Sequence, residues 1–146
     1  MIRRIFNYLA AGQLCSPTGL RAHTYVTALG LLAVTGMRIS ELVALNNDDV
    51  DLAYGQLTIH DAKFGKSRWL PLHSSTQQAL QRYVQRRDQQ YPSPCSSGFF
   101  VSEQDTRLTS CRVRATFVQL SRQIGLRGLT DSHGPRLHDF RHRFAV

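Results

Sequence analysis

Residues 20–45 read LRAHTYVTALGLLAVTGMRISELVAL, a long apolar stretch with a single break in its pattern. The first part, residues 20–34, is rich in Ala and Leu and contains no proline, which predicts a buried helix. Gly36 interrupts this pattern, and residues 39–45 predict a short second helix. Because Arg38 lies between the two predicted helices, we expect its charge to lie beside the core.

The rest of the chain predicts a small antiparallel sheet and three more helices. Strand-like runs at residues 57–59 and 68–70 flank a polar, glycine-containing loop, which indicates a β-hairpin. Residues 99–101 are a further candidate strand. The three predicted helices cover residues 74–90, with a capping box at 74–77, residues 109–124, which are basic and amphipathic, and residues 136–146. The predicted fold class is therefore α+β, mostly helical with a small antiparallel sheet.

The length of 146 residues suits one domain or a part of one. Residues 1–19 have weak periodicity and end in a turn-type cluster, so we expect a leader or linker there and the domain over residues 20–146. An apolar fraction of 42% excludes wholesale disorder. No apolar run approaches the roughly 20 residues of a membrane span, so we expect a cytoplasmic chain that is not bound to a membrane.

Basic side chains outnumber acidic ones by 18 to 10, a net charge of +8. Sixteen of the 18 are arginines, and the only lysines, Lys63 and Lys66, fall in the predicted hairpin loop. The planar guanidinium of arginine suits bidentate contacts with phosphate. The charge therefore makes a polyanion such as nucleic acid the first partner to consider, although a basic protein without an acidic partner remains an alternative.

Chemistry-bearing residues gather in three clusters. Glu41 follows Arg38 by three residues, one helical turn, where it can orient the guanidinium. The second cluster is the hairpin loop with the two lysines. In the third, His138 and Arg141 share a helix face and pair a titratable donor with a permanent charge, which suits a phosphate oxygen. Taken alone, each cluster also has a structural interpretation. The first can be an ordinary helix-start ion pair, which is the favoured interpretation of that cluster by itself, the second a solvated hairpin tip, and the third a basic surface helix.

A metal site is a remote alternative interpretation of the third cluster. His138 and His142 are four residues apart, a spacing that can bind a metal. The residue after the first histidine is Asp139 where a zincin helix has Glu, and Arg141 and Arg143 would repel a cation. A metal-dependent hydrolase built on the two histidines is therefore kept only as a remote possibility, and we expect no metal.

The three clusters follow one another in the order Thr-Gly-x-Arg-x-x-Glu, lysine hairpin, His-x-x-Arg. This combination resembles the catalytic domain of tyrosine recombinases, the phage integrase family, over residues 20–146. The resemblance implies the fold of that catalytic domain, in incomplete form. It also implies the family's activity, in which DNA strands are cleaved and rejoined through a phosphotyrosine link, as in the site-specific integrases of mobile elements. It implies double-stranded DNA and other recombinase protomers as partners, a nucleoid-associated location when bound to DNA, and no cofactor.

The resemblance also assigns roles to individual residues. Arg38, His138 and Arg141 are expected to hold the phosphate, with Glu41 positioning Arg38. Lys63 is expected to protonate the leaving 5′-oxygen as a general acid. Four further basic residues are expected to contact DNA: Lys66, Arg68, Arg112 and Arg114. His142 is expected to support the catalytic residues.

The resemblance is incomplete in one respect. The family's nucleophilic tyrosine follows His-x-x-Arg, whereas the five tyrosines of this chain all precede His138. We therefore expect a catalytic domain truncated after its second arginine and inactive alone, with residues 1–19 as the remnant of a link to a missing core-binding domain. The alternatives are a non-catalytic DNA-binding remnant or modulator of a full-length recombinase, or a tyrosine supplied by another chain. We also expect Phe140, Phe144 and Val146 to lack packing partners.

Overall fold

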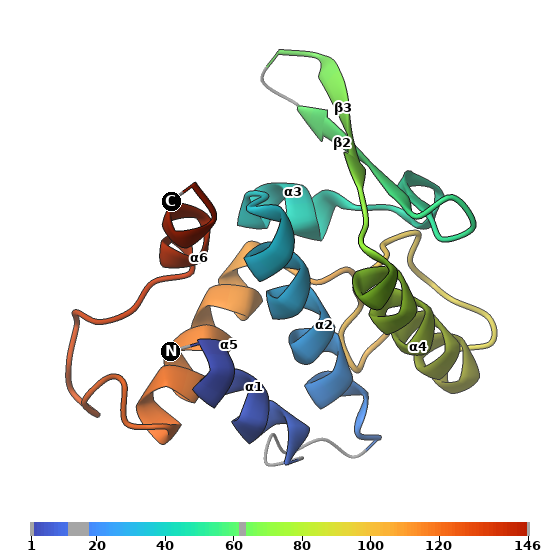
Figure 1. Cartoon of the computed structure of the whole chain (residues 1–146). Coiled ribbons are helices and arrows are strands. Elements are labelled where there is room, and N and C mark those ends of the chain that lie inside the picture. The colour runs from blue at the N-terminus through green and yellow to red at the C-terminus, as the bar shows by residue number, and fades with distance from the viewer. Residues whose placement is uncertain (1, 12–17, 62–63, 146) are drawn as a thin grey trace.

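The computed structural model describes residues 2–11, 18–61 and 64–145. A helical body carries a β-hairpin that projects away from it (Figure 1). The helices and strands are α1 (Ile2–Ala10), α2 (Leu20–Thr35), α3 (Ile39–Ala44), the 3₁₀ turn η1 (Asn47–Asp49), β1 (Val50–Asp51), β2 (Gln56–Asp61), β3 (Lys66–Pro71), α4 (Ser74–Gln90), α5 (Ser110–Gln123) and α6 (His138–Ala145). Within the described ranges, no helix combines the length and the apolar character needed to span a bilayer.

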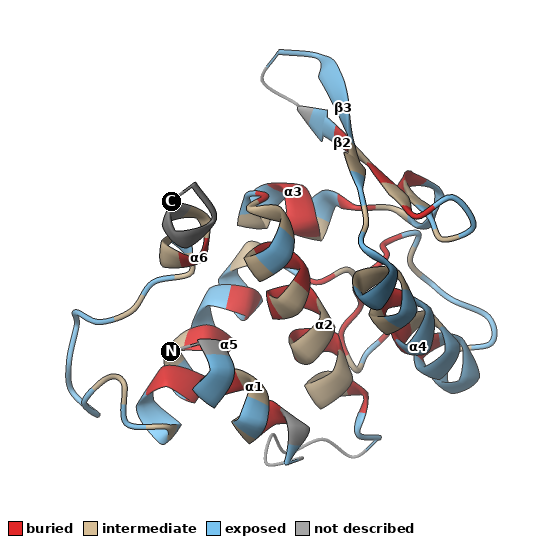
Figure 2. Cartoon of the chain, viewed as in Figure 1, coloured by how far each residue is buried: buried red, intermediate tan, exposed pale blue. Residues whose placement is uncertain are grey.

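Helix α2 is the centre of the helical body, and α1, α3, α4 and α6 all pack against it. Ala28 and Leu29 in its middle are fully buried, and its buried positions can be followed in Figure 2. The helix ends at Gly36, whose φ of 63° lies in the left-handed region and whose N–H donates to the Leu32 carbonyl at 3.1 Å. Glycine adopts this conformation without steric cost, so the predicted break after the long helix is confirmed.

Helix α1 forms within the stretch to which the sequence patterns assign no element. Ile5 and Leu9 are four residues apart and only 1% and 2% exposed, so they form a short apolar stripe against the core. Arg3, Arg4 and Asn7 lie on the exposed side. Two helical turns provide too few apolar repeats for a clear periodic signal, which explains why the helix was missed. That residues 1–19 once led to a further domain stays a prediction.

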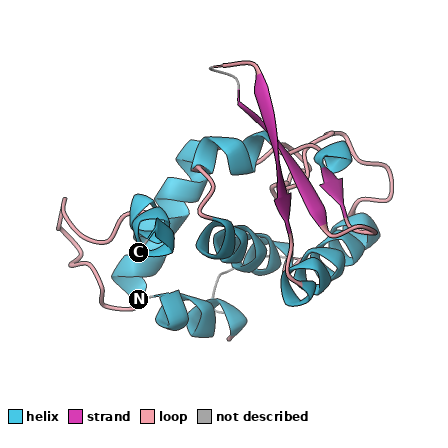
Figure 3. Cartoon of the chain, turned by 45° about the horizontal axis from the view of Figure 1, so that its top comes forward, coloured by secondary structure: helices cyan, strands magenta, loops and turns pink. Residues whose placement is uncertain are grey.

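The sheet has the strand order β1-β2-β3, with both pairs antiparallel (Figure 3). The predicted hairpin is confirmed, but the third strand is β1 and not residues 99–101. Val101 makes only an isolated bridge to Arg107, while Phe99 and Phe100 are buried against the ring of Tyr83. Aromatic residues are frequent in strands because strands bury large side chains. Here Phe99 and Phe100 are buried just as fully without belonging to a strand.

The start of α4 differs from the predicted capping box at residues 74–77. The N-cap residue is His73, whose side chain accepts a hydrogen bond from the Ser75 N–H at 3.4 Å. The extent of the helix is nevertheless as predicted, and Leu80 and Tyr83 on its apolar face are buried. An imidazole nitrogen can serve as the cap acceptor, and the serines that follow then lie inside the first turn.

Helix α6 is held to the body by Phe140. This side chain is 2% exposed and its ring meets that of Phe117 on α5 edge-on, with centroids 5.7 Å apart. The expectation that Phe140 lacks a partner is therefore wrong, because α5 and α2 provide one. The side chains of Phe144 and Val146, for which the same was expected, lie outside those that the structure describes.

Replacing Phe140 with alanine tests this anchor. Phe140→Ala removes a fully buried ring and leaves a cavity against Phe117, so the free energy of unfolding should fall by about 3 kcal/mol. Urea unfolding followed by circular dichroism measures the change. The matched control is Leu129→Ala, because Leu129 is 84% exposed and its loss should cost less than about 0.5 kcal/mol. Equal effects of the two substitutions would show that α6 is not anchored in this way.

Candidate functional site

The junction between α2 and α3 presents Arg38. Met37 is 3% exposed and fixes the chain to the core directly after the α2 terminus. Arg38 is extended, with φ −76° and ψ 150°, and is the N-cap residue of α3. Its backbone N–H donates to Oε2 of Glu41 at 2.7 Å. The backbone of Arg38 is therefore fixed, whereas 54% of its side chain is exposed.

Glu41 is a buried carboxylate between two arginines. Its side chain is 6% exposed, and Oε2 accepts from Nη2 of Arg68 on β3 at 2.9 Å. The other oxygen, Oε1, lies 3.6 Å from Nη1 of Arg38, an ion-pair distance. The expected contact between Glu41 and Arg38 is thus present, and Arg68 on the hairpin is a second partner that the sequence patterns do not predict.

The loop before α6 sets where that helix begins. Nη2 of Arg127 donates to the carbonyl of Pro135 at 3.1 Å, which holds the end of the loop. Oδ2 of Asp139 accepts from the Arg136 N–H at 2.7 Å and so satisfies a free donor at the helix start. His138 is the first residue of α6, and Arg141 follows one turn later on the same side.

Arg38, His138 and Arg141 line one cavity of about 460 Å³ between α2, α3, α5 and α6. Three more arginines line it as well: Arg114, Arg127 and Arg136. No Asp or Glu occurs among the described residues that line it. Five arginines and one histidine beside a cavity whose described lining holds no carboxylate make a site suited to an anion with several oxygens.

The other predicted site residues fall in different places. Arg114 lines this cavity, whereas Arg112 lines a separate one together with Arg21. Lys66 begins β3 and is exposed, without lining the cavity. Lys63 lies outside the described residues, and so does the side chain of His142.

Arg127 and Arg136 are cavity residues that sequence reasoning missed. Both lie in the segment between α5 and α6, and only the folding of that segment brings them to the same cavity as Arg38, about a hundred positions earlier in the chain. The one available signal is the excess of arginine in the second half of the sequence, which does not single out these two.

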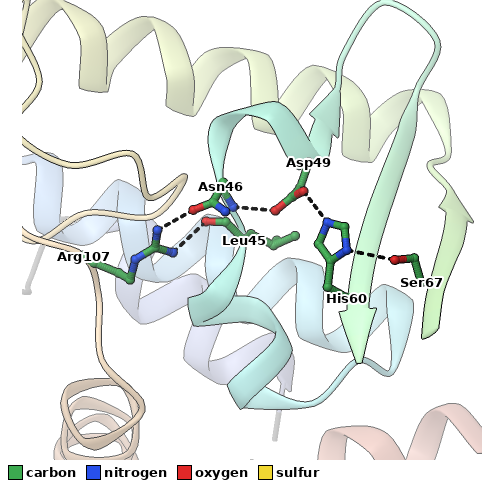
Figure 4. A network of polar contacts seen from close by, with 6 residues as sticks. All are labelled: Leu45, Asn46, Asp49, His60, Ser67 and Arg107. Carbon is green, nitrogen blue, oxygen red and sulfur yellow. Dashed lines mark hydrogen bonds and ion pairs between the residues drawn. The ribbon is translucent and has the colours of Figure 1, made fainter. Parts of the chain in front are cut away.

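A polar network fixes the other face of the hairpin (Figure 4). His60 on β2 contacts Oδ1 of Asp49 at 2.8 Å and the Ser67 hydroxyl on β3 at 2.9 Å. The second oxygen of Asp49 accepts from the Asn46 N–H at 2.9 Å, and the Asn46 side chain accepts from Arg107. The half of the hairpin nearer its turn, at the His60–Ser67 pair, is thereby held to the segment that follows α3.

None of the described residues that line the cavity is a tyrosine. Tyr25 and Tyr83 are buried, while Tyr54 is 87% exposed in the turn before β2. Burial raises the pKa of the Tyr83 phenol, whose oxygen accepts from the Val101 N–H at 3.1 Å. Within the described part of the chain, no group of three or more His, Cys, Asp or Glu side chains is arranged to hold a metal ion.

Comparison with known proteins gives one family. The model of the phage integrase family matches residues 2–146. The chain is 50% identical over 128 residues to a Sinorhizobium fredii protein whose assigned name is integrase/recombinase y4rB, covering 87% of this chain and 41% of that protein. It is 35% identical over 121 residues to tyrosine recombinase XerC of Roseiflexus, covering 81% and 36%. The chain thus spans about two fifths of the length of these relatives.

Solved structures share the fold at low sequence identity. The XerA recombinase superposes with a TM-score of 0.73 at 22% identity, over 99% of this chain and 46% of that one. XerH bound to its palindromic difH substrate gives 0.72 at 20%, over 99% and 39%. The catalytic core of lambda integrase gives 0.66 at 19%, over 97% and 80%. The chain belongs to the phage integrase family, and its fold is that of a tyrosine recombinase catalytic domain.

Proposed function

We propose that this chain binds double-stranded DNA and holds a backbone phosphate in the cavity between α3 and α6, as the phosphate-activating part of a site-specific recombinase. The observation that carries the proposal is the cavity lining of five arginines and His138 without a carboxylate. Family membership and the DNA-bound state of the similar XerH structure support the same substrate class.

Each cavity residue has a proposed part in the chemistry. The guanidinium groups of Arg38 and Arg141 hold the two nonbridging oxygens of the phosphate, and His138 donates to one of them. Negative charge on these oxygens grows as a nucleophile adds to phosphorus, so fixed donors stabilise the transition state more than the ground state. Arg114 contacts a DNA phosphate from α5, and Glu41 keeps Arg38 in place.

The leaving 5′-oxygen needs a proton, and Lys63 is proposed to supply it. The basis is its position in the sequence between β2 and β3, the two strands that project from the body (Figure 1). An ammonium can give up a proton at working pH when its surroundings lower its pKa, whereas a guanidinium cannot. Lys66, on the same hairpin, is proposed to contact the DNA backbone.

We propose further that the attacking tyrosine comes from outside these 146 residues, and that this chain alone binds DNA without cutting it. The absence of tyrosine from the described cavity lining supports this. The tyrosine then comes from another polypeptide segment or from a neighbouring protomer on DNA. A non-catalytic DNA-binding modulator of a full-length recombinase is the second candidate, and its binding surface would be the same. Either would act at the chromosome in the cytoplasm.

Duplex binding is expected to depend steeply on salt. Each phosphate neutralised by a basic side chain adds about 0.9 to the slope of log Kd against log salt concentration. Arg114→Met should lower this slope by about one and weaken binding at low salt. Fluorescence anisotropy with a labelled duplex, titrated at about 50 to about 200 mM salt, measures both quantities.

The control for this titration is Arg82→Met, the same change of charge at an exposed position of α4. Its slope should match that of the unchanged chain. Absence of binding at low salt, or affinity that is independent of salt, would refute the proposed function. The same titration with Arg112→Met decides whether the DNA surface reaches the second cavity.

The purified chain is expected to form no covalent adduct with DNA. A phosphotyrosine link survives denaturation, so an adduct would appear as a slower band on a denaturing gel with labelled duplex. A tyrosine-containing recombinase on its own site provides the positive control. If the 146-residue chain itself became covalently bound, one of its own tyrosines would be a nucleophile and the proposed division of roles would be wrong.

A further inference from the structure

The hairpin and the cavity are joined through one buried carboxylate. Oε2 of Glu41 accepts from the Arg38 N–H at 2.7 Å and from Nη2 of Arg68 at 2.9 Å. Oε1 is buried and has no hydrogen-bond partner among the described residues, and Nη1 of Arg38 is 3.6 Å away from it. Arg38 therefore lies just beyond hydrogen-bond distance of an acceptor that is open to it.

The charges of this trio are unequal. Two guanidinium groups share one carboxylate, which leaves a net charge of +1 beside the cavity. If Arg68 were absent, Glu41 would be a buried anion whose remaining described cation is Arg38. A buried charge without its partner is strongly unfavourable, so Arg38 would close the gap to Oε1. Its guanidinium would then be neutralised and turned from the cavity.

The pairing of β2 with β3 determines which face of the hairpin carries Arg68, and this is the face that meets Glu41. Arg68 pairs with Ile59 across the strands, so the two side chains lie on the same face of the hairpin. Ile59 is 1% exposed, which places that face against the body next to α3. His60 and Ser67 pair on the opposite face, where His60 contacts Asp49. The hairpin is thus held to the body on both faces. Of these two contacts, the one between Arg68 and Glu41 leads on to Arg38 at the cavity.

We infer that Arg68 is a positioning residue for Arg38, which acts through Glu41 and couples the place of the hairpin to the phosphate-binding ability of the cavity. The inference rests on the proposed function, in which Arg38 holds a phosphate. Arg68 does not itself line the cavity, so it acts on the bound phosphate through Glu41 and Arg38. When the hairpin lies in its described place, Arg68 occupies Glu41 and leaves Arg38 available to the phosphate.

The test is a titration of the chain with inorganic phosphate, followed by the NMR signals of the Arg38 Nε–H and the His138 ring. Arg68→Met should weaken phosphate binding roughly fivefold, within the usual range for coupling between sites. It should also shift the Arg38 signal before any phosphate is added. Arg68→Lys keeps a cation opposite Glu41 and should restore most of the affinity. Arg82→Met, the same charge change on α4, should alter the affinity less than twofold.

A second background tests the route through Glu41. In Glu41→Gln the carboxylate is neutral, so adding Arg68→Met should change phosphate affinity no further. The same loss in both backgrounds, or phosphate binding and an Arg38 signal in Arg68→Met that match the unchanged chain, would overturn the inference. Circular dichroism of each variant checks that it folds, and should Arg68→Met unfold, Arg68→Gln, which also removes the positive charge, replaces it in both backgrounds.

The two proposals fail in distinguishable ways. If the unchanged chain does not bind phosphate near Arg38 and His138, the proposed function is wrong. The shift of the Arg38 signal in ligand-free Arg68→Met would still report whether the three residues are coupled. If the unchanged chain binds phosphate and Arg68→Met binds it equally well, the function stands and the positioning role falls.

Discussion

The apolar residues of helix α2 have to be covered by other helices, and this constraint brings Arg38 close to His138 and Arg141. Its central residues Ala28 and Leu29 have no exposed surface, and α1, α3, α4 and α6 pack against it. Arg38 follows its carboxyl end directly, while His138 and Arg141 belong to a helix packed on its side. Burial of one apolar helix, a non-directional force, therefore assembles a cavity from residues about a hundred positions apart.

Apolar packing places the helices, but the orientation of charges within the site depends on Glu41. A carboxylate that is 6% exposed must be satisfied by donors, and these come from the α3 N-terminus and from β3. The same group therefore caps a helix, ties down a hairpin and faces Arg38. Because the two oxygen atoms of Glu41 serve all three contacts, a change at Arg68 alters the charge that Glu41 presents to Arg38.

How far the elements could be predicted depended on the length of their patterns. Helices α2, α4 and α5 have several turns of apolar repeats and were predicted within about two residues. Helix α1 has two apolar turns and was missed. The run Phe99–Phe100 has strand-forming residues, yet the ring of Tyr83 buries it in a turn, a tertiary contact that no local pattern contains.

The candidate site likewise divides into residues that sequence motifs identify and contacts that depend on the tertiary structure. The order of the three motifs was enough to select Arg38, His138 and Arg141, which the structure brings to one cavity. The partner of Arg68 could not be found in the same way, because Glu41 is 27 positions earlier and the contact exists only in the register that sets Arg68 opposite Ile59. Sequence thus identifies the charged groups, whereas the charge that each presents to a ligand depends on partners that only the folded chain provides. A one-residue slip of β3 would turn Arg68 to the other face and leave Glu41 with Arg38, without altering any motif.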